Sequence, residues 1–575
     1  MKKGVTDSSS RILSICHNLV AYFSMEIGFE NDIPTYSGGL GILAGDTVKS
    51  LADLGVDSVA ITLLSEKGYF YQSFDEHNLQ LEKDYNWNVA NHLKKLDVQV
   101  VVNIEGSDVK VNVWEYSLKG IRDHVVKILF LDTNVEGNPE VYKTLTSHLY
   151  GGDSLYRLRQ EMILGLGGVK VLRALSLYPK KYHMNEGHAA FLIKELFDEL
   201  SNLSSKSDKR SLIRTLCSFT THTPVAAGHD SFDKNVLLKE FSGNFPEELL
   251  SFALEGEKFS MTRLALNFSS YVNAVARKHQ EVSKRMFPDF SIDYITNGIH
   301  SITWTNKHHA SLFDKYIVDW RVNSMELRNA LKIPIDEIIL AHEKAKQELV
   351  DYINTTTNAG FEYDVFTIGF ARRATAYKRA ELLFNDIGRL KQISSSVGKI
   401  QIVFAGKAHP NDFQGKAIIK HIRELAEELS PEIKIVFLDN YNMFIGKLMT
   451  GGVDVWLNTP KRPLEASGTS GMKAAVNGVP SLSIPDGWWI EGLIEGFTGW
   501  AIGSEFVTGL SDQQIDDLDA NLLYEKLEQT IIPLFYNDFN SYAKIMRYAI
   551  AINAAYFNTH RMVKQYLVRA YTRNN

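Results

Sequence analysis

The segment 463–473, PLEASGTSGMK, is rich in side chains that could do chemistry. It lies between an expected strand and an expected helix, and its hydroxyls, its glycines and Glu465 could bind the hydroxyl groups of a sugar. Lys473 begins an otherwise apolar helical stretch, and a lysine in apolar surroundings loses its charge readily. A neutral amine can attack a carbonyl carbon, so Lys473 is a candidate Schiff-base lysine, although an exposed lysine at a helix start is the more common case.

The segment 371–379, ARRATAYKR, carries four cations within eight positions. Basic residues are unfavourable at the N-terminus of a helix, where the helix dipole is positive. Their clustering directly after an expected strand therefore favours a site where two or three of them converge on a dianion such as phosphate. A solvated basic helix start is the alternative.

A glycine-rich loop, Ser37-Gly38-Gly39-Leu40-Gly41, follows the first expected strand. Glycines let backbone N–H groups approach a phosphate or a sugar closely, and the N-terminus of a following helix favours an anion. A tight loop with packing glycines is an equally good interpretation of this motif alone.

Two histidine segments, 185–188 and 221–224, lie in the first half of the chain. Neither has the HExxH spacing of a zinc site, so no metal centre is predicted. His222 ends an expected strand and is a site candidate, whereas His183 is expected to be a structural histidine. Aromatic residues in the loops could stack on a flat ring or a sugar: Tyr36, Trp304, Tyr377, Tyr441, Trp488 and Trp489. Core packing is expected for Trp456.

A regular alternation of strands and helices must position the second half of these residues. Strands are expected at 365–370, 400–405, 433–438, 453–458 and 479–483, and helices at 380–390, 415–429, 443–449 and 472–477. Near-continuously apolar strands in this rhythm predict a parallel sheet covered on both faces, with ligands beyond the carboxyl ends of the strands.

The first half has a less regular mixed pattern. Strands are expected at 20–25, 58–64, 98–104, 125–131 and 216–221, helices at 156–175 and 189–200, a polar surface loop at 201–211 and a polar break at 355–360. The last part, 522–567, is expected to be helical. The sequence therefore predicts an α/β fold of two lobes with a cleft between them.

Composition excludes several classes of protein. The 62 Lys and Arg against 68 Asp and Glu give a net charge of −6, which does not suggest a bulk electrostatic nucleic-acid binder. The two cysteines, Cys16 and Cys217, suggest a reducing compartment, and we expect a cytoplasmic location. Ser, His and Asn interrupt the apolar residues near the N-terminus, which argues against a signal peptide. No apolar run reaches about 18 residues, so no membrane span is expected.

Four motifs occur here in a specific order: SGGLG at 37–41, YKR at 377–379 after an arginine pair, GKA at 406–408 and EASGTxxMK at 465–473. Together they resemble the glycogen, starch and maltodextrin phosphorylase family from about residue 21 to residue 491. The forms ARRATAYKR and DGWWIEG are similar to its short, divergent bacterial and archaeal branch.

This resemblance implies an architecture and an activity. It implies two Rossmann-like lobes of the GT-B type, 1–296 and 297–575, with the active site between them and the final helices packing on the first lobe. It implies a homodimer that transfers the terminal glucose of an α-1,4-glucan to inorganic phosphate, with retention, giving glucose 1-phosphate. The implied cofactor is pyridoxal 5′-phosphate, whose own phosphate shuttles the proton while Arg372, Arg373 and Lys378 screen the two phosphates.

The resemblance also assigns roles to residues. Lys473 matches the lysine that carries the cofactor as a Schiff base, and Arg373 matches the arginine that grips substrate phosphate. The other matches near the cofactor are Gly39, Trp304, Arg372, Tyr441 and Thr469; those near phosphate and the reacting sugar are Lys378, Tyr377 and His222; and those in the glucose pocket are Gly38, Asn297, Glu465, Ser467 and Gly468.

Two departures and two alternatives remain open at this point. Asn442 stands where many relatives have an arginine, and the chain is shorter than animal phosphorylases, so control by nucleotides or phosphorylation is not expected. A nucleotide-sugar glucosyltransferase such as a glycogen synthase would share the glycine-rich loop and a basic pair, but it would not need the Met472-Lys473 segment. A glycan-binding relative without catalytic activity is the other alternative.

Overall fold

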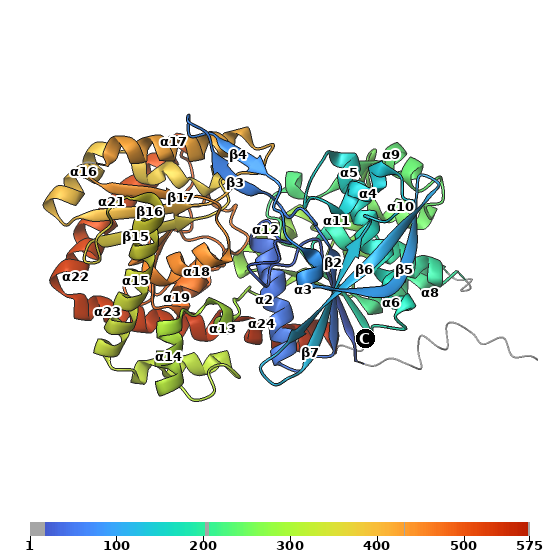
Figure 1. The fold of residues 1–575 in the computed structure, drawn as a ribbon, viewed down its shortest axis with the longest axis horizontal. Coiled ribbons are helices and arrows are strands. Elements are labelled where there is room, and N and C mark those ends of the chain that lie inside the picture. Colours follow the sequence, from blue (N-terminus) through green and yellow to red (C-terminus); the bar gives the residue numbers. More distant parts are fainter. Residues whose placement is uncertain (1–17, 202–205, 431, 573–575) are drawn as a thin grey trace, which may run out of the picture.

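The computed structural model describes residues 18–201, 206–430 and 432–572. Its first large sheet has nine strands in the order β14-β13-β9-β8-β1-β2-β7-β6-β5 (Figure 1). All of its pairs are parallel except β5 with β6 and β6 with β7. The strands are β1 Val20–Ser24, β2 Ser58–Leu63, β5 Lys94–Ile104, β6 Ser107–Lys119, β7 Val125–Asp132, β8 Lys181–Asn185, β9 Cys217–Thr220, β13 Tyr271–Ala274 and β14 Asp293–Tyr294.

The second large sheet has six parallel strands in the order β17-β16-β15-β18-β19-β20. These are β15 Phe366–Ala371, β16 Ile400–Ala405, β17 Lys434–Leu438, β18 Val455–Asn458, β19 Ser481–Ser483 and β20 Gly499–Ala501. The central strands β15, β16 and β18 are buried along their whole length, as continuous apolar runs in a doubly covered parallel sheet require. This confirms the parallel sheet predicted for the second half.

Helices of the second half surround this sheet. They include α15 Ile335–Thr357, α16 Ile387–Ser396, α17 Phe413–Leu429, α18 Met443–Gly452 and α19 Ser470–Val476. The expected helix 380–390 is wrong in its details, because short 3₁₀ turns at 376–378 and 380–384 precede α16. The interruption lies at Asp386, which caps α16, whereas Arg379, just before the expected helix, has a left-handed φ of 45°. Its guanidinium is held by Asp516 at 2.6 Å and Asp519 at 2.8 Å, so Arg379 lies apart from the other three cations of its segment.

Three helical segments of the first half also differ from expectation. The expected helix 156–175 is divided into α5 Ser154–Met162, a π-helical turn at 163–167 and α6 Gly168–Ala174, while α7 is Leu192–Glu199. The polar segment 201–211 is not a loop throughout, since α8 begins at Lys206 and ends at Leu216; residues 202–205 lie outside the described chain. The expected break at 355–360 begins three residues later, because α15 continues to Thr357 and ends at the left-handed Asn358.

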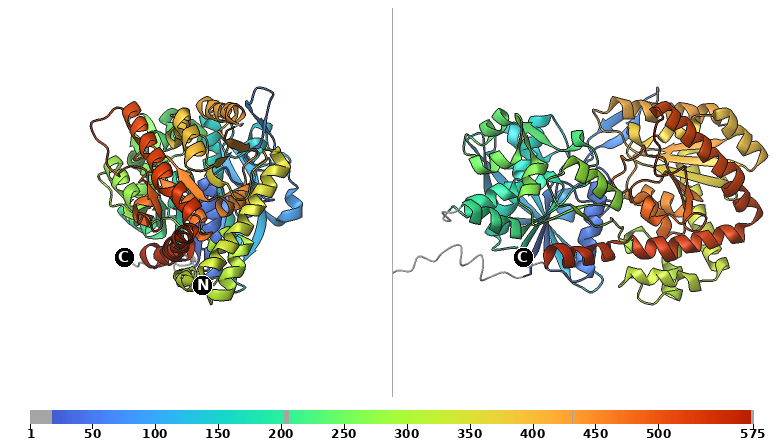
Figure 2. Two further views of the ribbon diagram at one scale, coloured as in Figure 1. Left: turned by 90° about the vertical axis from the view of Figure 1, so that its left-hand side faces the viewer. Right: turned by 180° about the vertical axis from the view of Figure 1, so that it is seen from behind.

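The C-terminal helices join the two sheets. From α23, Phe539–Tyr548, the chain continues to α24, Thr559–Tyr566, which packs against α2, Gly39–Asp53 (Figures 1 and 2). Tyr571 Oη lies 2.6 Å from His183 Nδ1, and Thr220 Oγ1 lies 2.8 Å from His183 Nε2. His183 is therefore a buried structural histidine, as expected.

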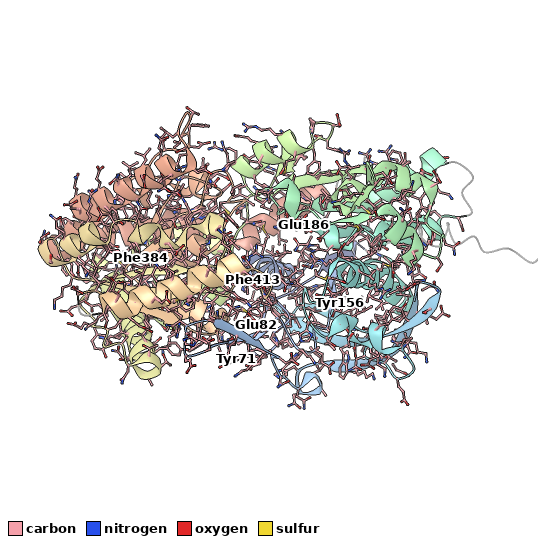
Figure 3. The ribbon with its side chains drawn as sticks, turned by 90° about the horizontal axis from the view of Figure 1, so that it is seen from above. Tyr71, Glu82, Tyr156, Glu186, Phe384 and Phe413 are labelled. Atoms are coloured by element: carbon pink, nitrogen blue, oxygen red, sulfur yellow. The ribbon has the colours of Figure 1, made fainter. Side chains whose placement is uncertain are left out.

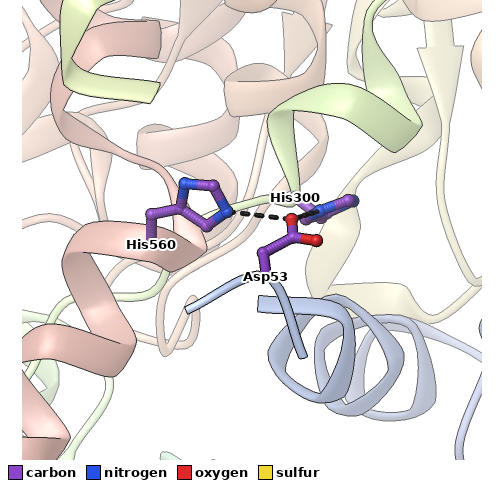
Figure 4. A group of neighbouring side chains, drawn as sticks. All are labelled: Asp53, His300 and His560. Atoms are coloured by element: carbon purple, nitrogen blue, oxygen red, sulfur yellow. Dashed lines mark hydrogen bonds and ion pairs between the residues drawn. The ribbon is translucent and has the colours of Figure 1, made fainter. Parts of the chain in front are cut away.

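Asp53, His300 and His560 form a buried hydrogen-bonded triad between α2 and the C-terminal helices. Asp53 Oδ2 lies 2.8 Å from His300 Nε2 and 3.0 Å from His560 Nε2 (Figure 4). Asp53 ends α2, His300 precedes α13, Ser301–Trp304, and His560 is on α24. One carboxylate thus connects three segments that are far apart in sequence.

A hairpin of the first half reaches the second sheet. It consists of β3 Tyr71–Phe74 and β4 Gln80–Lys83 (Figure 1; Tyr71 and Glu82 are labelled in Figure 3). Gln72 Nε2 donates to the carbonyl of Gly406 at 2.9 Å, and Gln80 Nε2 donates to that of Ala408 at 3.0 Å. This contact was not predicted from the sequence.

Several expectations concern single residues of the core and the termini. Trp456 and Cys217 are fully buried, whereas Cys16 and the first apolar residues near the N-terminus lie outside the described chain. Within the described ranges, no helix combines the length and the apolar character that crossing a membrane would require.

Candidate active site

Three polar side chains converge beyond the carboxyl ends of β15 and β18. Lys378 Nζ lies 2.6 Å from Glu465 Oε2, and Arg372 Nη2 lies 2.8 Å from the same oxygen. Arg372 also donates to Asn458 Oδ1, at the end of β18. Gly468 has a φ of 73°, and a Cβ at this position would be in ordinary contact with Glu465 and Arg372, at 3.4 to 3.6 Å. The two expected segments, 371–379 and 463–473, therefore meet at one point.

Burial and charge fix the protonation of this cluster. Glu465 is 6 % exposed, and the charges and hydrogen bonds of Arg372 and Lys378 outweigh the effect of burial and lower its pKa to about 2. Its backbone N–H donates to Asp486 Oδ2 at 2.9 Å. Burial and the nearby Glu465 raise the pKa of Asp486 to about 7. The carboxylate of Glu465 is thus ionised at neutral pH and can accept hydrogen bonds.

Lys473 lies in a different electrostatic setting. It is on α19, 7 % exposed, and its Nζ is 3.7 Å from the centre of the Trp304 ring. Burial lowers the pKa of this amine to about 8; Asp46 opposes the shift and Arg372 adds to it. Among the described residues, no acceptor hydrogen-bonds to Nζ. Lys473 is therefore a buried amine with an appreciable neutral fraction near neutral pH.

A pair of asparagine and aspartate side chains holds Trp304 in place. Asn477 Nδ2 donates to the backbone carbonyls of Trp304 and Lys473, both at 2.9 Å, and so ties α13 to α19. The indole Nε1 of Trp304 donates to Asp46 Oδ2 at 2.8 Å. The other oxygen of Asp46, Oδ1, is buried and has no partner among the described residues.

The remaining basic and aromatic candidates lie around this core. Arg373 is exposed, and no ion pair to it is found in the described part of the chain; its charge acts on Tyr69 and His409. Tyr377 lies under Lys378, whose Nζ is 4.3 Å from its ring centre. Tyr441 is half-buried near Arg372, and the loss of solvent around it raises its pKa to about 12. Asn442, at the position where many relatives have arginine, caps α18 by accepting from the N–H of Ile445 at 3.0 Å.

The glycine-rich loop at the start of α2 is held by Glu26. The N–H groups of Ser37 and Gly38 lie 2.5 and 3.3 Å from Glu26 Oε2. Tyr36 Oη accepts from the N–H of Met443 at 3.1 Å, which connects this loop to α18 and the neighbourhood of Tyr441. Gly39 begins α2, and Asp46 lies farther along the same helix.

Other residues of the expected sugar pocket are placed individually. His222 Nε2 lies 2.7 Å from Asn185 Oδ1, and burial lowers its pKa to about 4. Its backbone N–H donates to Glu186 Oε2 at 2.7 Å. Asn297 has a buried Oδ1 without a partner among the described residues. Among those residues, neither His222 nor Asn297 bonds directly to the Glu465 cluster.

Backbone carbonyls of the loop before α19 accept several local hydrogen bonds. Ser467 Oγ donates to the carbonyl of Gly468 at 3.2 Å, and the carbonyl of Ser467 accepts from Trp488 N–H at 2.9 Å. Thr469 precedes α19, and its carbonyl accepts from the N–H of Lys473 at 3.1 Å. Trp488 and Trp489 are buried and support this loop as core residues.

Sequence reasoning missed five polar residues of this region: Glu26, Asp46, Glu186, Asn458 and Asp486. Asp46 could have been predicted from the sequence, because it is a charged residue within an otherwise buried stretch of helix. The positions of Asp486 and Asn458 in the site could not have been predicted, because their contacts depend on which loops the sheet brings together.

Comparisons with known proteins give a consistent result. A family profile described as carbohydrate phosphorylase matches residues 238–532. A maltodextrin phosphorylase of Thermococcus litoralis is 38 % identical over 597 aligned positions, covering 96 % of this chain and 70 % of that protein. A glycogen phosphorylase of Aquifex aeolicus is 33 % identical, covering 96 % and 86 %. A glycogen phosphorylase of Mycobacterium bovis is 35 % identical, covering 90 % and 66 %.

Proposed function

This chain belongs to the carbohydrate phosphorylase family, and from that premise we propose that it is an α-1,4-glucan phosphorylase. The reaction transfers the terminal glucose of an α-glucan to inorganic phosphate, with retention, and releases α-glucose 1-phosphate. The names of the similar proteins, maltodextrin phosphorylase and glycogen phosphorylase, support this substrate class. The observation that carries the proposal is the buried amine of Lys473, which has no hydrogen-bond acceptor among the described residues, beside a cluster of cations that suits phosphate.

The residues around Lys473 fit pyridoxal 5′-phosphate. A carbonyl cofactor needs an amine that is partly neutral, which burial gives Lys473. The indole of Trp304 offers a flat surface at that amine, and the buried Asp46 Oδ1 without a partner is a free acceptor nearby. We propose that Lys473 holds the cofactor, with Arg372, Tyr441 and the backbone of Gly39 and Thr469 around it. When bound, the cofactor would supply a phosphate group with a second pKa of about 6, suited to proton exchange at neutral pH.

The cations would hold substrate phosphate. Arg373 is exposed and has no ion pair among the described residues, so its guanidinium fork is available for an anion. Lys378 is bonded to Glu465 and adds a second charge next to it. Two phosphate groups in one site repel each other, and the charges of Arg372, Arg373 and Lys378 would reduce that repulsion.

The glucose being transferred would be held by acceptors and donors of both halves. We assign this role to Gly38, Asn297, Glu465, Ser467 and Gly468, with His222 and Tyr377 next to the reacting bond. Glu465 has a pKa of about 2 and is bonded to two cations, so it is suited to accept from sugar hydroxyls and not to protonate a leaving group. The proton would then come from phosphate, which distinguishes this site from the paired carboxylates of glycosidases.

The architecture proposed with this function is the GT-B type. The first lobe would be 1–296 and the second 297–575, with the active site in a cleft between two Rossmann-like sheets and the last helices on the first lobe. The contacts of Tyr36 with Met443 and of Tyr571 with His183 support this arrangement. We also propose a cytoplasmic homodimer, in keeping with the family resemblance; light scattering would test the dimer.

A phosphate-dependent assay tests the function. The full chain, supplied with pyridoxal phosphate, should form glucose 1-phosphate from a maltodextrin only when inorganic phosphate is present. Lys473→Ala should abolish the product and the absorbance of bound cofactor, whereas Lys284→Ala, at an exposed lysine, should change neither. Product formation without phosphate, or no product from short and long glucans alike, would contradict the proposal.

A further inference from the structure

A cavity of about 510 Å³ shares Trp304 with the candidate active site. It is lined by residues of α2, of the segment that joins α13 to α14 (Lys307–Tyr316), of α15 and of α18. Of the described residues, its lining includes Trp304 but neither Arg372, Tyr441 nor Lys473. The cavity is therefore distinct from the place assigned to the cofactor.

Two amines without counter-ions line this cavity. Lys49 Nζ donates to the neutral hydroxyl of Thr303 at 3.0 Å, and Lys447 is half-buried on α18. In the described ranges, neither lysine has a carboxylate within ion-pair distance. Burial lowers the pKa of both. The charges of Asp46, Glu30 and Asp53 oppose this shift at Lys49, and the positive charge of Lys49 lowers the pKa of Lys447 further. Two close ammonium groups out of bulk water, without a counter-ion, are costly unless an anion joins them.

The other charged groups of the lining do not neutralise this pair. Lys307 is paired with Glu348, which also lies 3.0 Å from His308 Nε2. Glu30 is exposed to solvent and is the remaining carboxylate of the lining. Three lysines (Lys49, Lys307 and Lys447) therefore line the cavity against two carboxylates (Glu30 and Glu348), so the charge of the lining is positive.

The walls between these charges are apolar and partly aromatic. Phe29, Trp304, Met443 and Leu448 contribute to them, and Phe444 lies at the exposed side. Flat apolar walls with a few placed charges are the usual form of a site for a small organic ligand, and lysine binds phosphate and carboxylate as a point charge. We propose that this cavity binds a small organic anion, in which a phosphate or carboxylate group is held by Lys49 and Lys447 and an apolar body lies against Trp304.

Occupancy would act on the candidate active site through α2. Lys49 follows Asp46 by three positions on that helix, so the two side chains are neighbours on one face. Asp46 accepts from the indole of Trp304 and acts on the charge of Lys473. A bound anion would therefore change the electric field at the Lys473 amine as well as the packing against Trp304.

Titration calorimetry with phenyl phosphate, benzoate and inorganic phosphate tests the site. The protein is the full chain, loaded with pyridoxal phosphate and freed of excess cofactor. We expect phenyl phosphate or benzoate to bind more tightly than inorganic phosphate, and the tighter of the two identifies the anionic group. Lys49→Met and Lys447→Met should each weaken that binding at least about tenfold, because a charged hydrogen bond is lost. Lys284→Met, an exposed lysine on α12, Arg277–Met286, is the matched control and should leave it unchanged.

A second arm separates this cavity from the catalytic cations. Arg373→Ala should leave the binding of the organic probe intact, since Arg373 does not line the cavity. Loss of binding in Arg373→Ala, equal binding in both lysine variants and wild type, or no binding of any probe would each overturn the proposal. If Lys49→Met does not fold, as checked by circular dichroism, the more exposed Lys447→Met decides alone. The inference does not depend on phosphorolysis, so failure of the activity assay leaves it standing.

Discussion

Glu465 and Lys473 are buried charges that the fold treats in opposite ways. Glu465 accepts from Arg372 and Lys378, so its charge is compensated within the protein. Lys473 contacts an indole face and has no counter-ion within bonding distance in the described part of the chain, so burial destabilises its charge. The first arrangement keeps an acceptor ionised, and the second keeps an amine reactive.

Glu465→Gln should destabilise the protein. The neutral amide would leave Arg372 and Lys378 buried without a counter-charge, and breaking a buried ion pair typically costs about 3 kcal/mol or more of the free energy of unfolding. Inorganic phosphate should restore more stability to this variant than to the wild type, because it replaces the missing negative charge. Urea unfolding with and without phosphate measures both effects.

The matched control is Glu255→Gln, whose carboxylate pairs with Arg263 at the surface. Solvent-exposed pairs contribute about 1 kcal/mol at most, so this variant should unfold almost like the wild type. Equal stability of Glu465→Gln and Glu255→Gln would contradict the reading of Glu465 as the counter-ion of the cluster.

Asp46→Asn should make Lys473 more reactive at lower pH. Asp46 raises the pKa of the Lys473 amine, and the amide removes that charge while keeping an acceptor for the Trp304 indole. The pKa, about 8 in the native chain, should therefore fall. Borohydride trapping of pyridoxal phosphate on Lys473 at a series of pH values, followed by mass spectrometry, would show a midpoint shifted downward. Asp97→Asn, on the edge strand β5, should leave the midpoint in place.

How much of the site could be predicted differs from residue to residue. Lys473, Arg372, Lys378 and Glu465 were identified from residue types in short segments, and the structure brings these four together. Asp486 was not identified, because its raised pKa arises from burial and from the approach of Glu465, which lies on a different loop. Such a role depends on tertiary contacts, which local spacing does not contain.

At the scale of elements, the second sheet was predictable and the bridging hairpin was not. Continuous apolar runs such as Ile400–Ala405 have a single stable outcome, a strand covered on both faces. The expected helix 380–390 was wrong because Asp386 leaves the helical conformation and caps a new helix, α16, by accepting from the N–H of Arg389. Hairpin β3–β4 has short polar strands whose partners, Gly406, Ala408 and Asn440, are more than 300 residues away.

Gln72→Ala should loosen this hairpin from the second sheet. Gln72 is 1 % exposed; its Nε2 donates to Gly406 O at 2.9 Å, and its Oε1 accepts from Asn440 N–H at 2.9 Å. Leaving these buried backbone groups without partners costs about 1 to 3 kcal/mol each in the local structure. Hydrogen exchange should accelerate at residues 71–83 and at Asn440. Gln99→Ala, on the edge strand β5, should leave exchange there unchanged, and unchanged exchange in Gln72→Ala would argue against the hairpin as a connection between the sheets.

At the scale of the whole molecule, histidines with a lowered pKa lie buried or half-buried in both halves of the chain. His183 and His222 lie at the first sheet, His300 lies in the triad of Figure 4, and His279 and His309 lie on α12 and α14, Lys307–Tyr316. Burial lowers the pKa of His183 and His309 to about 3 and that of His222 and His279 to about 4, and it also lowers that of His300. These groups are neutral in the fold and would be charged in the unfolded chain at mildly acidic pH.

The protein should therefore lose stability as the pH falls below about 6.5, the ordinary histidine pKa. Below that value the unfolded chain binds protons that the folded chain cannot, so each such histidine costs roughly 1 kcal/mol per pH unit until its folded pKa is reached. Urea unfolding between pH 8 and pH 5 should show a steep decline. His183→Gln removes one such group and keeps a donor for Tyr571 or Thr220, so its decline should be less steep by about one proton. The exposed His77→Gln should retain the native slope, and equal slopes for all three proteins would refute the neutral buried state of His183.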